Sequence, residues 1–191
     1  SRNKSDRKEV GVINFNGAYS SYIVMPGDAI HAVPENLDSK KAALTEPTAV
    51  ILRAIRRIRN RLTPQAKIAV TGAGPIGFLC SQVLALEGYK VSVFDRNNDR
   101  LKLLKDKVSS ISTSLVDLES FNVIIEATGS KDVLEQVIKD SRTDCTIMLL
   151  GFPYGDINYN FEDLVGQEKV FAGSVGGDPQ DFHQALKLLP K

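Results

Sequence analysis

Residues 68–77 read Ile68-Ala-Val-Thr71-Gly72-Ala-Gly74-Pro75-Ile76-Gly77, and this stretch decides the fold. It places Gly-x-Gly-x-x-Gly directly after an apolar run and at the opening of a helix-like run. Gly72 permits a tight turn, Gly74 removes a side chain that would keep a phosphate away, and Gly77 lets helix and strand pack closely. A first-turn proline, Pro75, loses only an amide that the helix does not use. The pattern predicts a turn whose free amides and positive helix end face negative phosphates.

A second signal follows in the next apolar run, Val91-Ser-Val-Phe-Asp95, which ends in a carboxylate 23 residues after Gly72. A carboxylate at this place accepts hydrogen bonds from the adenosine ribose hydroxyls of a dinucleotide. The negative charge of Asp95 favours NAD, because it repels a 2′-phosphate. Arg96 follows directly and could pair with such a phosphate, so NADP stays open. Strand, turn, helix, strand and acid in this order predict dinucleotide binding over a turn that binds nothing.

From residue 67 onward, apolar runs alternate with helix-like segments. We expect strands at 67–71, 90–94, 122–127, 146–150 and 169–172, and helices at 75–87, 99–105, 131–139, 161–166 and 179–189. Four of these strands lack polar alternation, as is typical of a parallel sheet covered on both faces. Residues 108–121 must supply both a third strand and its crossover, so we expect a trimmed crossover there. The predicted fold is α/β, a doubly wound parallel Rossmann sheet with strand order 3-2-1-4-5-6.

The chain before this alternation has a different character. Residues 10–15 and 19–24 form short β-rich runs, separated by Gly17. They are too few to close a barrel or sandwich. We therefore predict three parts: an incomplete β-rich catalytic lobe at 1–45, a linking helix at 46–63 and the Rossmann domain at 64–191.

The linking helix has two distinct faces. Its apolar face, with Ile51 and Ile55 at its centre, also carries Val50, Ala54, Ile58 and Leu62. The opposite face carries four arginines, Arg53, Arg56, Arg57 and Arg61, with Arg59 beside them. A nucleic-acid or phosphate site is the alternative, but no aromatic residues are interleaved. We interpret the arginine face as solvated.

Charge and composition narrow the class of function. The chain has 24 basic and 23 acidic residues, a net charge of +1. Such a balance produces no strong electrostatic field that would attract nucleic acid or an anionic membrane. No apolar run is long enough to span a bilayer, and the opening residues 1–6 lack the apolar region of a signal peptide. We expect a soluble, cytoplasmic protein with small-molecule partners. Cys80 and Cys145 lack a Cys-x-x-Cys partner, so we expect buried, inert thiols.

Several further segments occur in an order known from one enzyme family. They are residues 17–22 (Gly-Ala-Tyr-Ser-Ser-Tyr), 34–37 (Pro-Glu-Asn-Leu), 42–47 (Ala-Ala-Leu-Thr-Glu-Pro), 124–129 (Ile-Ile-Glu-Ala-Thr-Gly), 149–152 (Leu-Leu-Gly-Phe) and 173–177 (Gly-Ser-Val-Gly-Gly). With the glycine turn and Asp95, they give a sequence that resembles the medium-chain, zinc-containing alcohol and polyol dehydrogenases. The strongest likeness is to glucose and sorbitol dehydrogenases. The resemblance covers nearly all of residues 16–189.

The resemblance implies an oxidoreductase that transfers hydride between NAD(P) and an alcohol, polyol or sugar, with a GroES-like catalytic lobe and a zinc ion. It implies that Glu46 is the zinc-site carboxylate, with a catalytic and metal-binding role. It also implies a set of cofactor-binding residues. In this set Gly72, Gly74, Pro75, Ile76 and Gly77 form the phosphate turn, Asp95 holds ribose beside Arg96, Arg100 lies at the adenosine end, Thr128 and Gly151 flank the nicotinamide, and the turn from Ser174 closes that side. Family members also suggest a homodimer formed through the edge strand at 169–172.

The sequence departs from the family pattern in its metal ligands. The upstream cysteine, the Gly-His-Glu motif and the four-cysteine zinc lobe have no counterpart, and the closing strands of the catalytic lobe are also missing. His31 and His183 lack ligand spacing to Glu46, so we expect ordinary packed or surface histidines. The pattern indicates a fragment or truncated chain that binds NAD with little or no turnover and without zinc.

Other functional interpretations of the sequence remain open. A non-catalytic NAD-sensing module would also explain the missing ligands. Methyltransferases share a glycine-rich turn and an acid, but their adenosylmethionine has no pyrophosphate to need the third glycine. Short-chain dehydrogenases are disfavoured because the chain has no Tyr-x-x-x-Lys.

Overall fold

The computed structural model describes residues 9–157 and 159–190. By its internal contacts the chain divides into two compact units, Ser1–Ala32 and Val33–Lys191. The charged opening of the sequence, residues 1–8, lies outside the described residues. The two units are described separately below.

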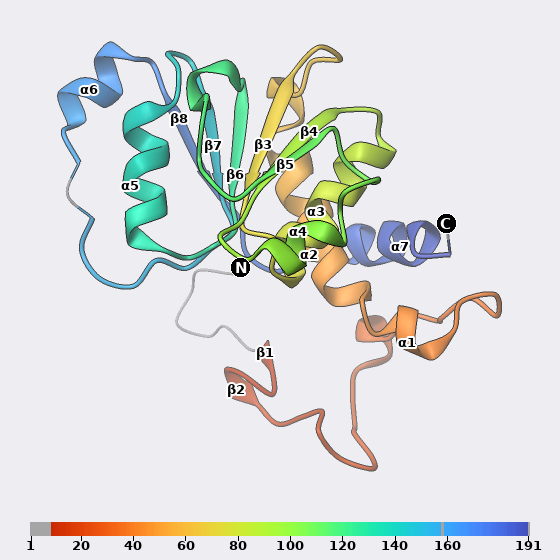
Figure 1. The fold of residues 1–191 in the computed structure, drawn as a ribbon. Helices are drawn as coiled ribbons and strands as arrows, with labels where there is room; N and C mark the ends of the chain where they lie inside the picture. The colour runs from red at the N-terminus through yellow and green to blue at the C-terminus, as the bar shows by residue number, and fades with distance from the viewer. Residues whose placement is uncertain (1–8, 158, 191) are drawn as a thin grey trace. The chain divides into compact units, whose positions relative to one another are not determined.

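The larger unit is built on a sheet of six parallel strands in the order β5-β4-β3-β6-β7-β8 (Figure 1). Their bounds are β3 Lys67–Thr71, β4 Lys90–Phe94, β5 Ser110–Ser112, β6 Val123–Glu126, β7 Thr146–Leu149 and β8 Val170–Gly173. Counted from the first strand of the sheet, this order is 3-2-1-4-5-6, so the predicted doubly wound Rossmann topology is confirmed. The order reverses between β3 and β6, where a doubly wound sheet opens a crevice at its carboxyl edge.

Helices cover both faces of the sheet (Figure 1). One face packs against α2, α3, α4 and α7, and the other packs against α5, with α6 beside it. The α-helix bounds are α1 Ser39–Ala42, α2 Thr45–Arg57, α3 Pro75–Leu86, α4 Asn98–Lys102, α5 Lys131–Asp140, α6 Phe161–Gly166 and α7 Pro179–Leu188. Three short 3-10 helices, Gly27–Ala29, Arg59–Arg61 and Leu118–Ser120, complete the described elements. The expected helix at 99–105 ends earlier, at Lys102, and continues as turns with i to i+3 hydrogen bonds.

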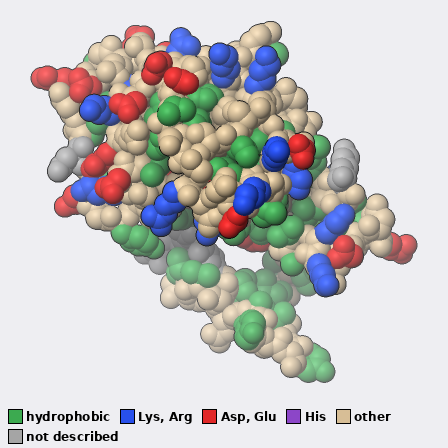
Figure 2. Space-filling model, in the orientation of Figure 1, with side chains coloured by type: hydrophobic (Ala, Val, Ile, Leu, Met, Phe, Trp, Pro, Cys, Tyr) green, Lys and Arg blue, Asp and Glu red, His purple; other side chains and the backbone are tan. Residues whose placement is uncertain are grey.

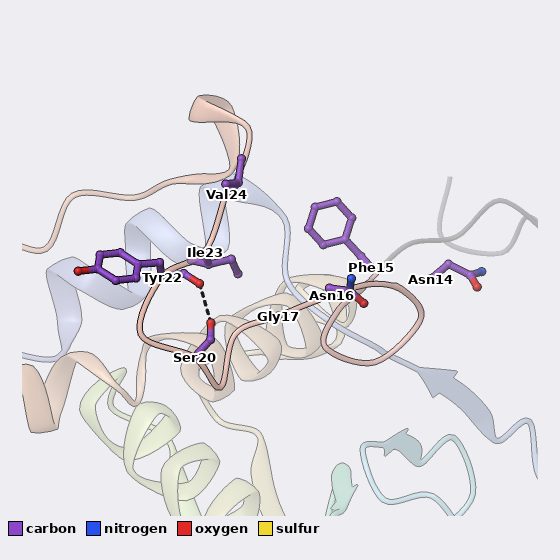
Figure 3. A pocket seen from close by; sticks show the side chains of 8 residues that line it. All are labelled: Asn14, Phe15, Asn16, Gly17, Ser20, Tyr22, Ile23 and Val24. Atoms are coloured by element: carbon purple, nitrogen blue, oxygen red, sulfur yellow. Dashed lines mark hydrogen bonds between the residues drawn. The ribbon is translucent and has the colours of Figure 1, made fainter.

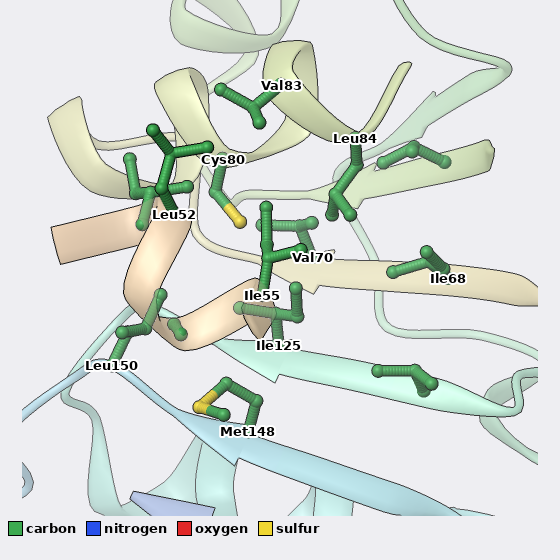
Figure 4. Close-up of a cluster of buried hydrophobic side chains, with 14 of the residues drawn as sticks. Leu52, Ile55, Ile68, Val70, Cys80, Val83, Leu84, Ile125, Met148 and Leu150 are labelled. Atoms are coloured by element: carbon green, nitrogen blue, oxygen red, sulfur yellow. The ribbon is translucent and has the colours of Figure 1, made fainter. Parts of the chain in front are cut away.

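The core forms because successive strand residues point to opposite faces. In β3, Ile68 and Val70 join the cluster under α2 and α3, whereas Ala69 joins the cluster under α5. Figure 4 shows the first cluster, in which Ile55 of α2 and Leu84 of α3 lie over the strands. Burial on both faces explains why these strands read as continuous apolar runs.

The crossover after β5 is trimmed, as predicted. A single 3-10 turn, Leu118–Ser120, replaces an α-helix. Leu118 and Phe121 are buried, and the Phe121 ring meets Phe94 edge-on at a centroid distance of 5.8 Å. Two large side chains therefore cover the sheet where a crossover helix would otherwise lie.

The arginine face of α2 is largely exposed, as expected, but most of its arginines also form ion pairs. Arg53 is only 17% exposed and pairs with Asp178, while Arg56 binds Asp178 at 2.8 Å and the buried Asp181 at 2.9 Å. Arg59 pairs with Glu87, and Arg61 pairs with Asp144. Helix α7 packs on α2, and Asp178 and Asp181 at its N-terminus neutralise Arg53 and Arg56. On the face in Figure 2, basic and acidic side chains are correspondingly intermixed.

The smaller unit contains two strands of two residues each, β1 Glu9–Val10 and β2 Asn14–Phe15, paired in parallel. The β-rich run at 10–15 thus pairs only with itself and residue 9. The β-rich run at 19–24 does not form a strand, contrary to what its composition indicates. Tyr19, Tyr22 and Val24 are almost fully exposed, and no strand among the described residues of this unit pairs with them. An extended segment without a neighbour leaves its backbone groups to water.

Three further expectations concern reactivity, the sheet edge and the membrane. Cys80 and Cys145 are buried and unpaired in disulfides, and burial raises the pKa of Cys80 to about 12 and that of Cys145 to about 11. Both thiols thus stay protonated and inert near neutral pH, as predicted. Strand β8 is an edge of the sheet, as predicted. In the described part of the chain, every helix is too short or too polar to cross a bilayer.

Candidate functional site

A cavity of about 630 Å³ opens at the carboxyl edge of the sheet, where β3, β4 and β6 end. Its size falls in the range of about 300–1,000 Å³ typical of ligand pockets. The register pairs Thr71 with Phe94 on one side and with Glu126 on the other, so three strand ends meet at one level. The lining comprises Thr71, Gly72, Gly74, Pro75, Phe94, Asp95, Arg96, Arg100, Thr113, Leu115, Ala127, Thr128, Ser130, Val133 and Gln136.

The glycine turn forms one wall of this cavity. Gly72 has φ +94°, in the left-handed region that favours glycine, and its amide donates to the Phe94 carbonyl at 2.6 Å. Gly74 precedes helix α3 as its N-cap, and a Cβ at this position would meet nothing within 4 Å. The space in front of Gly74 is therefore free for a ligand, as the sequence pattern predicts.

The third glycine acts through packing. A Cβ on Gly77 would lie 1.8 Å from the Gly72 carbonyl oxygen. Helix α3 thus starts in direct contact with the turn, and its N-terminal residues Gly74 and Pro75 line the cavity. This arrangement presents the positive end of a helix dipole to an anion.

Asp95 ties the second strand end to the glycine turn. Its carboxylate accepts from the Ala73 amide at 2.6 Å and from the Asn97 amide at 2.7 Å, and its side chain is only 8% exposed. Each carboxylate oxygen has two lone pairs, so both oxygens retain capacity for a ligand hydroxyl. The sequence pattern predicts the position of Asp95, but it does not reveal the bond to Ala73.

Two cations flank this carboxylate. The Arg100 guanidinium lies 3.8 Å from Asp95 Oδ2, and both Arg96 and Arg100 line the cavity. More than half of the Arg100 side chain is exposed, so solvent screens this ion pair. The carboxylate end of the cavity therefore combines a hydroxyl acceptor with two groups able to bind a phosphate.

The structure brings together seven of the residues expected at the site: Gly72, Gly74, Pro75, Asp95, Arg96, Arg100 and Thr128. Ile76 packs against the core instead. Gly151 and Ser174 follow β7 and β8, outside this lining. The Ser174 hydroxyl is buried and has no hydrogen-bond partner among the described residues. Glu46 is exposed in the first turn of α2.

Other residues at this edge were not singled out from the sequence. Leu115, Val133 and Gln136 also line the cavity. Glu126 ends β6 as a fully buried acid. Only Glu126 left a signal in the sequence, because a charged residue ends an otherwise apolar strand directly before Thr128.

The described residues do not fit a zinc centre. Across residues 9–157 and 159–190, no three His, Cys, Asp or Glu side chains lie close enough to hold a metal ion. A catalytic zinc takes about three protein ligands plus an open position. Glu46 on its own does not meet this requirement.

A second hollow, of about 470 Å³, lies within the smaller unit (Figure 3). Its lining runs along one segment from Asn14 to Val24, where the Ser20 hydroxyl donates to the Tyr22 carbonyl at 2.7 Å. Charged side chains do not contribute to this lining. It therefore lacks the charged groups that line the cavity at the sheet edge.

Comparison with known proteins assigns the family. Residues 39–191 match the family described as Glucose dehydrogenase C-terminus. Sorbitol dehydrogenase of Halalkalibacterium halodurans is 28% identical over 189 residues, which cover 91% of this chain and 54% of the relative. Glucose 1-dehydrogenase 2 of Vulcanisaeta moutnovskia is 32% identical over 196 residues, which cover 95% and 56%. The chain thus spans about half the length of these curated relatives.

Solved structures agree on the fold. An alcohol dehydrogenase of Escherichia coli CFT073, crystallised with NADH, superposes on this chain with a TM-score of 0.81 at 23% identity. The matched region covers 92% of this chain and 55% of that structure's chain. TarJ of Staphylococcus aureus, crystallised with NADPH, gives a TM-score of 0.78 at 21% identity and covers 87% and 55%. With the family match over most of its length, this chain belongs to the Glucose dehydrogenase C-terminus family of the medium-chain alcohol and polyol dehydrogenases.

Proposed function

We propose that this chain is the nicotinamide-dinucleotide-binding part of a dehydrogenase that moves hydride between NAD(P) and a hydroxyl or carbonyl substrate. One observation carries the proposal. The open face of Gly74, the start of α3 and the Asp95 carboxylate meet around a single cavity. A pyrophosphate needs the first two groups, and a ribose needs the third.

The residues present have distinct tasks in this proposal. The first amides of α3 bind the pyrophosphate across Gly74, which leaves room for close approach. Asp95 accepts from the ribose hydroxyls, and Arg96 and Arg100 line the adenosine end. When bound, the nicotinamide ring gives or takes the hydride. Gly151 and Ser174, at the ends of β7 and β8, stay predictions for the nicotinamide end.

The relatives support a substrate class but not a single substrate. Their names, sorbitol dehydrogenase and glucose 1-dehydrogenase, point to a polyol or sugar. We propose the same class here, and we derive no step through zinc, because the described residues do not fit one. Pairing of two copies through β8 and the cytoplasmic location also stay predictions.

Asp95 offers the direct test. Replacing Asp95→Asn keeps the shape but removes the charge and one acceptor, so NAD should bind about tenfold more weakly or worse. The preference for NAD over NADP should narrow at the same time, because Arg96 and Arg100 remain. Isothermal titration calorimetry with both nucleotides measures each effect.

Asp99→Asn is the matched control, since Asp99 lies on the same segment, is largely exposed and pairs with Lys102. It should bind both nucleotides as the parent does. A parent chain that gives no heat with either nucleotide contradicts the proposed function. An Asp95→Asn variant with unchanged affinity contradicts the role of Asp95.

A further inference from the structure

Glu126 is a fully buried acid whose task the proposed function leaves open. Its side chain is 0% exposed at the end of β6. Burying a carboxylate is costly unless hydrogen bonds replace its lost water. Here they do: Glu126 accepts from the Thr128 amide at 2.7 Å, from the Thr128 hydroxyl, and from the Gly129 amide at 3.4 Å. The carboxylate thus closes the turn that follows its own strand.

This turn is a wall of the cavity. Thr128 and Ser130 line the cavity, and Thr128 Cγ2 would lie 3.0 Å from a Cβ placed on Gly72. The turn therefore stands directly against the glycine turn. Any shift of the Thr128 turn changes the width of the site.

The neighbouring strand end prevents Glu126 from moving away. A Cβ on Gly151 would lie 2.5 Å from Glu126 Oε2 and 2.3 Å from the Gly129 amide nitrogen. The Gly151 amide also donates to the Glu126 carbonyl at 2.9 Å. Glycine at 151 thus leaves just enough room for the carboxylate and fixes its place.

The hydrogen bonds decide what the Thr128 hydroxyl offers a ligand. A hydroxyl has one proton and two lone pairs. The proton goes to Glu126 Oε1, which also accepts from the Thr128 amide, and one lone pair accepts from the Ser130 amide at 2.9 Å. One lone pair remains. Thr128 therefore acts toward a ligand as an acceptor only.

We infer that Glu126 is a positioning residue of the dinucleotide site, which holds Thr128 as an acceptor for a neutral hydroxyl or amino group on the adenosine half of the ligand. The inference rests on the proposed function. The family resemblance implies a place for Thr128 beside the nicotinamide. The adenosine half is indicated instead, because Thr128 shares the cavity with Asp95 and Arg96, whereas Gly151 lies outside its lining. The donor is either a ribose hydroxyl or the amino group of adenine, and an anionic oxygen is disfavoured because it has no proton to give.

The test measures dissociation constants for NAD and for three analogues: nicotinamide hypoxanthine dinucleotide and NAD lacking the 2′- or 3′-hydroxyl of the adenosine ribose. For the parent, at least one analogue should bind about threefold to tenfold more weakly than NAD. Thr128→Val, which has the same shape without a hydroxyl, should lose that particular penalty, and Thr128→Ser should restore it. The analogue whose penalty disappears identifies the donor.

Glu126→Gln tests the positioning role. Its amide would point an N–H at the Gly129 amide, so NAD should bind several-fold more weakly and the same analogue penalty should shrink. Ser81→Ala is the matched control, because Ser81 is buried and donates to the Phe78 carbonyl outside the cavity. It can lower stability but should keep every ratio of dissociation constants.

The outcomes separate the two claims. A parent chain that binds no dinucleotide overturns the proposed function, and this inference with it. A parent chain that binds NAD, with Thr128→Val keeping every parental penalty, overturns the inference alone. If a folded Glu126→Gln variant binds NAD with the parental affinity and keeps the parental ratios of analogue to NAD dissociation constants, Glu126 has no positioning role.

Discussion

Replacing Gly74→Ala should leave the fold intact and strongly weaken dinucleotide binding. The new Cβ meets no atom within 4 Å, and Gly74 has φ −69°, which alanine adopts without strain. The stability should therefore stay within about 1 kcal/mol of the parent. The same methyl occupies the space through which a pyrophosphate would approach. An overpacking cost of about 1–3 kcal/mol corresponds to roughly a 5- to 150-fold rise in Kd.

The measurement combines thermal unfolding with calorimetric titration of NAD. Gly166→Ala is the matched control, since a Cβ there also meets nothing within 4 Å, but Gly166 ends α6 outside the cavity. It should bind NAD as the parent does. Equal affinity of the Gly74→Ala variant and the parent would show that no phosphate passes over Gly74.

Replacing Gly77→Ala should, in contrast, lower the stability of the fold itself. Its Cβ would lie 1.8 Å from the Gly72 carbonyl oxygen and 2.9 Å from the Gly72 carbonyl carbon. Both are backbone atoms at the end of β3, so no side-chain rotation relieves the clash. Helix α3 must move off the sheet and disturb a close-packed core, at a cost of about 3 kcal/mol or more.

Such a loss lowers the melting temperature by roughly 6–12 °C for a chain of this size. Circular dichroism melting, with Gly166→Ala again beside it, measures the shift. Binding should fall as well, because the first amides of α3 move with the helix. A Gly77→Ala variant that melts within a degree or two of the parent would contradict the close contact between helix and turn.

The sheet was predictable from the sequence because its strands are buried on both faces. The five strands expected from apolar runs lie within one residue of the observed bounds, and the glycine turn fixes which strand comes first. The remaining strand, β5, has three residues and the sequence Ser110-Ile111-Ser112, so it lacks an apolar run. Only the need for a third strand indicated its presence.

The less predictable features depend on contacts between segments distant in sequence. The run at 19–24 has strand composition, but composition does not reveal that it finds no partner strand among the described residues of its unit. The pairing of Arg53 with Asp178 likewise joins residues 125 positions apart. At the site, position predicted Asp95, whereas the burial of Glu126 follows from the neighbouring strands. The sequence pattern therefore located the cavity, whereas the packing of neighbouring strands determined how its walls are held in place.

The pairing of α2 with α7 has a consequence for biosynthesis. These helices stand near opposite ends of the larger unit in sequence, yet they share one interface and one set of ion pairs. A ribosome releases α2 long before α7 is made, so the nascent chain must carry an uncovered apolar surface and unmatched cations through most of its synthesis. Helix α7 completes this interface, so chaperone capture of the nascent chain is best sought before α7 has been synthesised.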